Sequence, residues 1–347
     1  MSERIGVVVP LHNYNVYVTP QLLRKVNKEN KRLLDDFVAY LKAASRSSLT
    51  INGYISDINM AFVWALQNID NKSFIKWTKR DVLALQQWLI VDRELSPQRV
   101  RRLKSALSSM ANFIARVLDD EYPNFRNIIN SIESPPSHPV KEKTVWSDEE
   151  LEELLNNLAG HRQYEKACYV ALAMYSGRRK AELCRFLVSD FNDSRLVCDG
   201  ALYKSHPIKT KGRGGGKYIP CYTLAKKFKP WLDLWLKERE NCGIESEWLF
   251  PNKNDPTKHI EISTANSWSV TFSRITGKPA YIHSFRHYFT TCLAKAGIPD
   301  SVIQTIVAWE SSDMVRLYTD LDAEEQIADY FKDGEIVLKK RKAFAEI

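Results

Sequence analysis

A polar stretch with three prolines, IESPPSHPVKEKTV at residues 132–145, divides the 347-residue chain. Amphipathic helical patterns precede and follow it, whereas the stretch itself has no apolar period, which is typical of a linker. Because 347 residues exceed what a single core usually supports, we expect two domains, each able to bury its own core. The expected parts are an N-terminal extension at 1–30, a helical domain at 31–131, the linker, and a second domain at 146–347.

Four amphipathic helical patterns follow one another in the first domain. They cover about 31–43, 51–69, 79–91 and 97–118, and Ser96 followed by Pro97 is a favourable start for the fourth. One face of the fourth helical pattern is apolar, and the opposite face is basic. It is either a solvated helix face or a surface that lies against phosphates or in a nucleic-acid groove. The basic residues of this face are Arg99, Arg101, Arg102 and Lys104.

Positive charge is concentrated in the first domain. The chain has 50 Lys and Arg against 42 Asp and Glu, a net charge of +8. Residues 1–140 carry 19 basic and 13 acidic residues, an excess of six, while residues 141–347 carry 31 and 29, an excess of two. This distribution favours a polyanionic partner for the first domain.

The cysteines and the apolar runs exclude several classes of protein. The six cysteines lie between residues 168 and 292 without a C-x-x-C pair, so we expect reduced thiols and no metal site. No window reaches the roughly 18 consecutive apolar residues of a membrane span, and the start, MSERIGVVVP, has too short an apolar run for a secretory signal. We expect a cytoplasmic protein with no membrane partner.

The second domain has mostly helical patterns around one hairpin. Ser147 and Glu150 form a capping-box pattern at its start, and helical patterns continue to about residue 188. Residues 195–222 instead hold short apolar and threonine-containing runs around GRGGG, which indicates a hairpin with a flexible turn. Helical patterns resume over about 223–240, 263–276, 283–297, 299–308 and 311–333.

Two short segments hold residues that could carry out chemistry. In AMYSGRRKAELCRFL, Arg179 and Glu182 follow Gly177 at helical spacing, which by itself is more typical of an ion pair within a helix. The second segment lies about a hundred residues later, and each of its polar or aromatic residues alone has an ordinary structural explanation. In order, they are His283, Arg286, Trp309 and, nine residues further on, Tyr318.

Taken together, the two segments resemble the signature boxes of the tyrosine recombinase (phage integrase) family. The first box is matched by Gly177, Arg179, Glu182 and Leu183, and the second by His283, Arg286, His287, Trp309 and Tyr318. The resemblance covers about 145–333, and the helical patterns before it fit the family's SAM-like core-binding domain by shape. It implies a mainly α, two-domain DNA clamp whose catalytic domain has a small antiparallel β-sheet.

The resemblance also implies a role for each site residue. Tyr318 would attack a DNA phosphodiester and form a 3′-phosphotyrosyl bond, which keeps the bond energy, so no ATP or other cofactor is needed. Arg179 and Arg286 would hold the phosphate, because guanidinium forks suit its oxygens. His283 would accept or share the tyrosine proton, and Glu182 would orient a neighbouring arginine or histidine.

The family draws the acid for the leaving 5′-oxygen from a lysine in a β-hairpin. Lys211 precedes Pro220 by nine residues, which is similar to the family's spacing, and we therefore prefer it. Lys209 remains the alternative catalytic lysine.

Two positions of the boxes need comment. Trp309 stands where most members of the family have His, and since an indole N–H donates but cannot shuttle a proton, we expect it to position and pack. In the doublet Arg178-Arg179 we prefer Arg179, because Glu182 follows it by three residues. A slip of one residue would turn the side chain by about 100°.

We therefore expect a site-specific recombinase or integrase of the Cre or Xer type, which acts on double-stranded DNA with specific recombination sites. Exchange between two duplexes requires a homo-tetramer, and the helix expected at about 322–333 is our candidate for the segment passed to a neighbouring copy. Accessory DNA-bending or directionality proteins stay open as partners. The rival interpretations are a type IB topoisomerase and a catalytically inactive DNA-binding regulator of the same fold.

Overall fold

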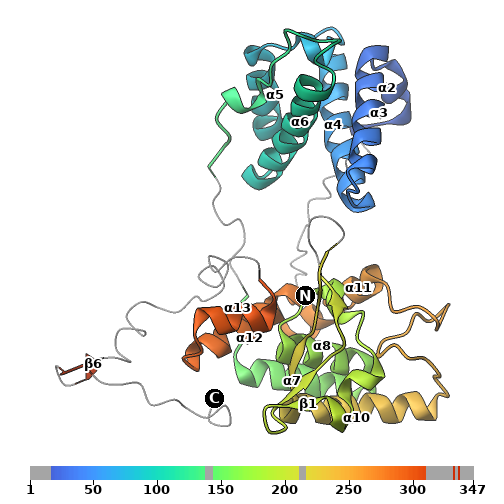
Figure 1. Ribbon diagram of the computed structural model, residues 1–347, viewed down its shortest axis with the longest axis vertical. Coiled ribbons are helices and arrows are strands. Elements are labelled where there is room, and N and C mark those ends of the chain that lie inside the picture. The colour runs from blue at the N-terminus through green and yellow to red at the C-terminus, as the bar shows by residue number, and fades with distance from the viewer. Residues whose placement is uncertain (1–16, 137–143, 211–215, 310–330, 333–334, 337–347) are drawn as a thin grey trace, which may run out of the picture. The chain divides into compact units, whose positions relative to one another are not determined.

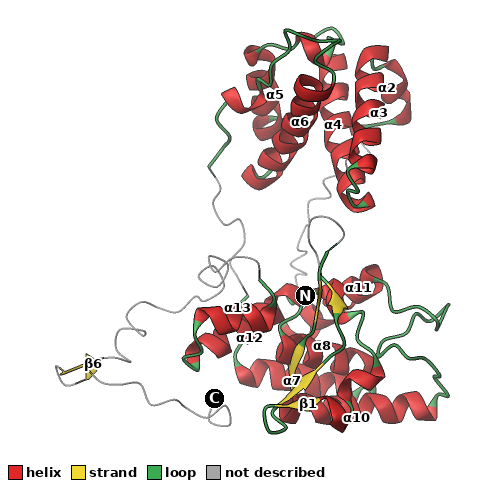
Figure 2. Cartoon of the chain, in the orientation of Figure 1, coloured by secondary structure: helices red, strands yellow, loops and turns green. Residues whose placement is uncertain are grey.

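The computed structural model describes residues 17–136, 144–210, 216–309, 331–332 and 335–336. The chain divides into two compact units, one within residues 1–142 and the other from residue 143 onward apart from 213–215. Helices make up most of both units, and the strands are short (Figure 1, Figure 2). The fold class is thus confirmed as mainly helical with small antiparallel sheets.

The first unit is a bundle of helices with capped starts. Asn27, Ser47, Thr78 and Ser96 each accept a hydrogen bond from a backbone N–H of the following first turn. The apolar faces of these helices meet in one core, in which Leu33, Ile58 and Leu107 are wholly buried. The described helices of this unit are α2 (Pro20–Lys25), α3 (Lys28–Ala43), α4 (Ser48–Asn68), α5 (Lys79–Val91) and α6 (Pro97–Val117), with the 3-10 turns η1 (Phe74–Lys76) and η2 (Ile129–Ser131).

The helices of the first unit begin before residue 31, where the sequence analysis ended the N-terminal extension. Asn27 fixes the start of α3: its Nδ2 donates to the carbonyl of Asn71 at 2.6 Å, and its backbone N–H donates to the Asn71 side chain at 3.0 Å. The apolar periodicity did not indicate α2, because this helix has six residues and none of them is buried.

The second unit is organised around α8 (Tyr164–Ser176). Of its 13 residues nine are buried, and it packs against α7, α10 and α12 (Figure 1). A helix surrounded in this way holds its C-terminal end rigidly, and the candidate site begins at that end. The other helical elements are α7 (Asp148–Gly160), α9 (Lys180–Leu183), η3 (Val188–Phe191), η4 (Asp193–Arg195), α10 (Ala225–Asn241), α11 (Ile262–Thr276), α12 (Ile282–Lys295) and α13 (Asp300–Val307).

The strands of the second unit form small antiparallel sheets. β1 (Leu196–Val197), β2 (Leu202–Lys204) and β5 (Tyr222–Leu224) pair in the order β1-β2-β5. β3 (Ile208–Lys209) and β4 (Tyr218–Ile219) form the predicted hairpin, with Lys209 opposite Tyr218. β4 is followed directly by Pro220 and Cys221, which lead into β5.

The expected helix over 311–333 is wrong at its C-terminal end. Phe331–Lys332 is a strand, β6, which pairs with β7 (Glu335–Ile336). The sequence holds a signal for this pairing, because Asp-Gly between the two strands favours a two-residue hairpin turn. Residues 310–330, which include Tyr318 and most of the segment at 322–333, lie outside the described residues.

None of the helices in the described part of the chain combines the length and the apolar character needed to cross a bilayer.

Candidate active site

The site begins at the junction between α8 and α9. α8 ends at Gly177, whose φ of 59° lies in the left-handed region that side chains disfavour. A Cβ on Gly177 would lie 2.4 Å from Cδ1 of Phe289 on α12. Both the backbone and the packing therefore require glycine here, and the chain turns at once into the segment of the first signature box.

Arg286 from α12 is bound to this junction. Its side chain is wholly buried, its Nη1 donates to the Gly177 carbonyl at 2.7 Å, and its Nη2 donates to the Val307 carbonyl at 2.9 Å. The two acceptors lie at the ends of α8 and α13. The guanidinium plane is thus oriented by backbone atoms from two helices.

Trp309 packs on Arg286. The indole follows Ala308, a left-handed residue with φ 53° at the end of α13, and its backbone N–H donates to the Gln304 carbonyl at 3.0 Å. The ring lies 5.0 Å from Cζ of Arg286, within the range of a cation–π contact, and the residue is buried. Trp309 is therefore a buried packing partner of the Arg286 guanidinium.

His283 lies one helical turn before Arg286. Its ring is edge-on to that of His287, with centroids 5.4 Å apart. Partial burial and the positive charges of Arg286, His287 and Arg179 lower the pKa of His283 to about 4. The imidazole is therefore neutral at pH 7 and able to accept a proton.

Arg179 and Glu182 form a pair beside this cluster. Arg179 Nη1 lies 3.2 Å from Oε1 of Glu182, and the backbone N–H of Arg179 donates to Oε2 at 3.3 Å. The Arg179 side chain is 29% exposed, whereas that of Glu182 is buried. A buried carboxylate thus holds an arginine whose other side reaches the surface.

Arg178 is turned into the protein, where its Nε lies 2.7 Å from Sγ of Cys221 and its Nη2 donates to the Pro220 carbonyl at 3.0 Å. It is 1% exposed. Arg178 and Arg179 were predicted only as alternative phosphate ligands, and this inward contact of Arg178 was not predicted. The doublet itself is the only sequence signal of it.

Of the two hairpin lysines, Lys209 lies among the described residues. Lys209 is exposed on β3, and its carbonyl accepts a hydrogen bond from Nη1 of Arg185 at 2.7 Å. Lys211 lies outside the described residues, as does Tyr318. The structure therefore brings together Arg179, Glu182, His283, Arg286 and Trp309.

The basic face of α6 in the first unit is only partly exposed. Arg101 and Arg102 are exposed, but Lys104 is buried, with its ammonium donating to Gln86 at 2.7 Å and to the Ile132 carbonyl at 2.5 Å. Burial lowers the pKa of Lys104. The expectation that Lys104 belongs to an exposed face is corrected, because the chain returning after η2 covers that side of the helix.

Arg99 and Arg102 pair with a buried carboxylate on α4. Nη2 of Arg99 lies 2.5 Å from one oxygen of Asp57, and Nε of Arg102 lies 3.3 Å from the other. Neither contact has the alignment of a hydrogen bond, so the interaction is mainly one of charge. Asp57 therefore holds the guanidinium groups of both arginines by charge, while the Arg102 side chain remains 57% exposed.

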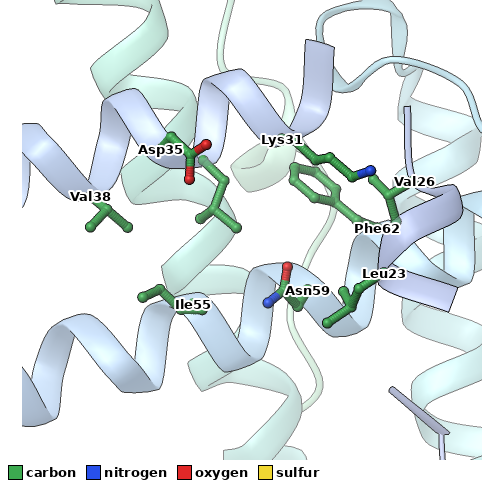
Figure 3. Close-up of a pocket in the computed structure, with 9 residues that line it drawn as sticks. Leu23, Val26, Lys31, Asp35, Val38, Ile55, Asn59 and Phe62 are labelled. Carbon is green, nitrogen blue, oxygen red and sulfur yellow. The ribbon is translucent and has the colours of Figure 1, made fainter. Parts of the chain in front are cut away.

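A groove in the first unit lies apart from these residues. It runs between α3 and α4 beside α2, and Figure 3 shows Asp35 and Val38 on one side and Ile55 and Asn59 on the other. The ammonium of Lys31 at its edge donates to the Arg24 carbonyl at 2.7 Å. None of the predicted site residues lines this groove.

A family model matches this chain. Residues 145–325 match the model of the phage integrase family. Because the match covers more than half of the chain, the chain belongs to this family, and its class is that of the tyrosine recombinases and integrases.

Relatives from bacteria and archaea are similar over most of their length. The SPbeta prophage-derived recombinase-like protein YomM of Bacillus subtilis (strain 168) is 26% identical over 274 residues, which are 78% of this chain and 80% of that protein. The tyrosine recombinase XerA of Pyrococcus horikoshii is 22% identical over 295 residues, covering 84% and 89%.

Solved structures share the fold. The post-cleavage complex of XerH site-specific recombinase with a palindromic difH substrate has a TM-score of 0.63 at 19% identity, covering 90% of this chain and 89% of that one. A lambda integrase dimer bound to a COC′ core site has a TM-score of 0.62 at 15% identity, covering 84% and 95%.

Proposed function

We propose that this chain is a site-specific recombinase that cuts and rejoins DNA strands through a 3′-phosphotyrosyl intermediate on Tyr318. One arrangement carries the proposal: Arg286, held by the carbonyls that close α8 and α13, lies in the same cluster as Arg179 and a neutral His283. Membership of the family supports the proposal, as do the DNA-bound complexes among the solved structures.

Arg179 and Arg286 would bind the scissile phosphate. A phosphodiester carries one negative charge, and more charge collects on its non-bridging oxygens as the attacking bond forms. Guanidinium groups that are already oriented stabilise this charge without reorganising during the reaction. Backbone carbonyls orient Arg286 and the buried Glu182 orients Arg179, so both groups meet this requirement.

The reaction exchanges one phosphate ester for another. The Tyr318 oxygen forms a bond to phosphorus, and its proton passes to neutral His283 or to water. The bond from phosphorus to the 5′-oxygen breaks with its electron pair on oxygen, which takes a proton from a hairpin lysine. Lys211 is the preferred donor and Lys209 its rival. The free 5′-hydroxyl of another strand then reverses the steps, and no cofactor enters the balance.

The first unit would hold the duplex through α6. Arg101 and Arg102 are the exposed basic residues of the predicted face, so they would contact phosphates or base edges, while Lys104 acts within the fold. Since each active site cuts one strand, exchange between two duplexes requires four copies. We propose that the chain after Tyr318 links neighbouring copies in this tetramer.

Covalent trapping tests the proposal. The protein is incubated with nicked duplexes taken from the DNA that flanks its own gene, and a protease-sensitive protein–DNA adduct is sought on a denaturing gel. Tyr318→Phe should abolish the adduct. Tyr281→Phe is the matched control, because it removes the same hydroxyl from a tyrosine at the start of α12. We expect the control to form the adduct at the wild-type level.

The outcomes separate the proposal from its rivals. An adduct that survives in Tyr318→Phe means that another residue is the nucleophile. Tight DNA binding with no adduct on any substrate favours a DNA-binding regulator. Relaxation of supercoiled plasmid by monomeric protein, without a preferred cleavage sequence, favours a type IB topoisomerase.

A further inference from the structure

Arg178 connects the first signature box to the hairpin. Its backbone lies between Gly177 and Arg179, but its side chain reaches the residues that directly follow β4. Nη2 donates to the Pro220 carbonyl at 3.0 Å, and Nε lies 2.7 Å from Sγ of Cys221. The two segments are more than 40 residues apart in sequence, so this side chain fixes the position of the hairpin relative to the first signature box.

A second arginine from the same segment holds the other strand of the hairpin. Arg185, which follows α9, donates from Nη1 to the carbonyl of Lys209 at the end of β3. Within the hairpin, Thr210 N–H donates to the Lys217 carbonyl at 2.7 Å, so the two strands are also bound to each other. Residues 178–185 therefore hold both strands at the base of the hairpin.

The burial of Arg178 is energetically unfavourable by itself. Its Nη1 has no hydrogen-bond partner among the described residues, and a carboxylate oxygen of Glu182 lies 3.7 Å from Nε. An apolar side chain would fill the same space without taking a charge out of water. The arginine contributes what an apolar side chain cannot, which is a pair of directed contacts to Pro220 and Cys221.

We propose that Arg178 is a positioning residue that sets the lysine-bearing hairpin relative to the phosphate-binding Arg179, with Arg185 holding the opposite strand. The inference rests on the proposed function, in which a hairpin lysine gives a proton to the leaving 5′-oxygen. Arg178 touches no DNA. It acts by keeping the lysine within proton-transfer distance of that oxygen.

A change of leaving group isolates this role. Two nicked substrates are made that differ only at the 5′-bridging atom of the cleaved bond, oxygen in one and sulfur in the other. A thiol has a pKa of about 8.5, so a thiolate leaves without first taking a proton. A variant with a misplaced acid is therefore slow on the oxygen substrate and recovers on the sulfur substrate. A variant that binds phosphate poorly is slow on both.

The variants are Arg178→Met, Arg178→Lys and Arg185→Ala, compared with Lys211→Ala and Lys209→Ala. Arg239→Met is the matched control. Arg239 is also a buried arginine of the second unit, but it donates to the carbonyls of Ser246, Trp248 and Leu249, away from the hairpin. Circular dichroism and thermal melting establish that each variant is folded.

We expect Arg178→Met to slow cleavage of the oxygen substrate by about 100-fold, the lower end of what a general acid contributes, and to slow the sulfur substrate by less than about 10-fold. Of Lys211→Ala and Lys209→Ala, the variant that lacks the general acid should also be slow on the oxygen substrate and recover on the sulfur substrate. Arg185→Ala should show a smaller difference between the two substrates, because Arg178 still holds the residues that follow β4. Arg239→Met should change both rates by one common factor.

Equal slowing of both substrates by Arg178→Met and Arg185→Ala would overturn the inference, as would wild-type rates in both variants. If Arg178→Met does not fold, the ratio of the two rates in Arg178→Lys and Arg185→Ala decides in the same way. Wild-type protein that cleaves neither substrate overturns the proposed function instead, so the two failures are distinguishable.

Discussion

Replacing Gly177 with alanine tests how the turn after α8 supports the candidate site. The residue has φ 59°, its carbonyl accepts the hydrogen bond from Nη1 of Arg286, and an added Cβ would lie 2.4 Å from Phe289. Real Cβ atoms do not approach that closely, so either the α12 ring or the turn must move. Movement of the turn also displaces the acceptor that orients Arg286.

The expected magnitude has two parts. A left-handed backbone costs a non-glycine residue about 1–2 kcal/mol. Overpacking a buried ring adds about 1–3 kcal/mol, which gives a loss of about 2–5 kcal/mol in the free energy of unfolding. For a unit of this size the melting temperature should fall by about 4–20 °C.

Two other glycines of the same unit separate these parts. Gly243 has φ 63° with no atom within 4 Å of an added Cβ, so Gly243→Ala should cost only the backbone part. Gly160 ends α7 without a positive φ and also has open space, so Gly160→Ala should be neutral or slightly stabilising. Urea unfolding and adduct formation are measured for all three variants.

We expect Gly177→Ala to be the least stable of the three and the only one that loses adduct formation. If Gly177→Ala is no less stable than Gly243→Ala, the Phe289 ring gives way freely and the packing argument is refuted. Normal adduct formation in a destabilised Gly177→Ala would refute the link between the turn and Arg286.

Three further predictions concern single side chains. In the DNA-free protein, NMR titration of His283 should give a pKa of about 4, and a pKa near 6.5 would contradict this prediction. Binding of DNA should raise the pKa, because a phosphate anion favours the imidazolium. The pKa of His283 is lower in the folded protein than in the unfolded chain, so the unfolded chain binds more protons between pH 6.5 and about 4. The free energy of unfolding should therefore decrease as the pH is lowered through this range, and this decrease should be smaller in His283→Gln than in wild type. Trp309→Ala should lower the free energy of unfolding by about 3–5 kcal/mol and reduce the amount of adduct, and Trp309→Phe should lie between Trp309→Ala and wild type. Equal amounts of adduct in all three proteins would refute a role for the stacking of Trp309 on Arg286. In Arg102→Ala, the slope of the logarithm of the DNA-binding constant against the logarithm of salt concentration should be smaller by about 1. In Lys104→Ala this slope should stay as in wild type, but the protein should be less stable. An unchanged slope in Arg102→Ala would show that Arg102 does not contact DNA.

The sequence was sufficient for features that depend on neighbours within a few residues. The starts of α6 and α7 were readable because Ser96 and Ser147 cap them, and apolar periodicity indicated the longer helices. The spacing of His283, Arg286 and Trp309 indicated the family, which the family model confirms. Apolar periodicity failed where a helix was too short to bury a face, as in α2, and at the end of the expected helix over 311–333, where β6 pairs with β7.

Tertiary structure decided which of several similar side chains is buried and what it contacts. Arg178 and Arg179 are adjacent and chemically identical, yet one is buried against Cys221 and the other reaches the surface beside Glu182. Lys104 belongs to the same basic run as Arg102, but the chain at Ile132 covers it. Adjacent side chains point in different directions, so the surroundings of each depend on segments that are distant in sequence, and those become fixed only when the whole core packs.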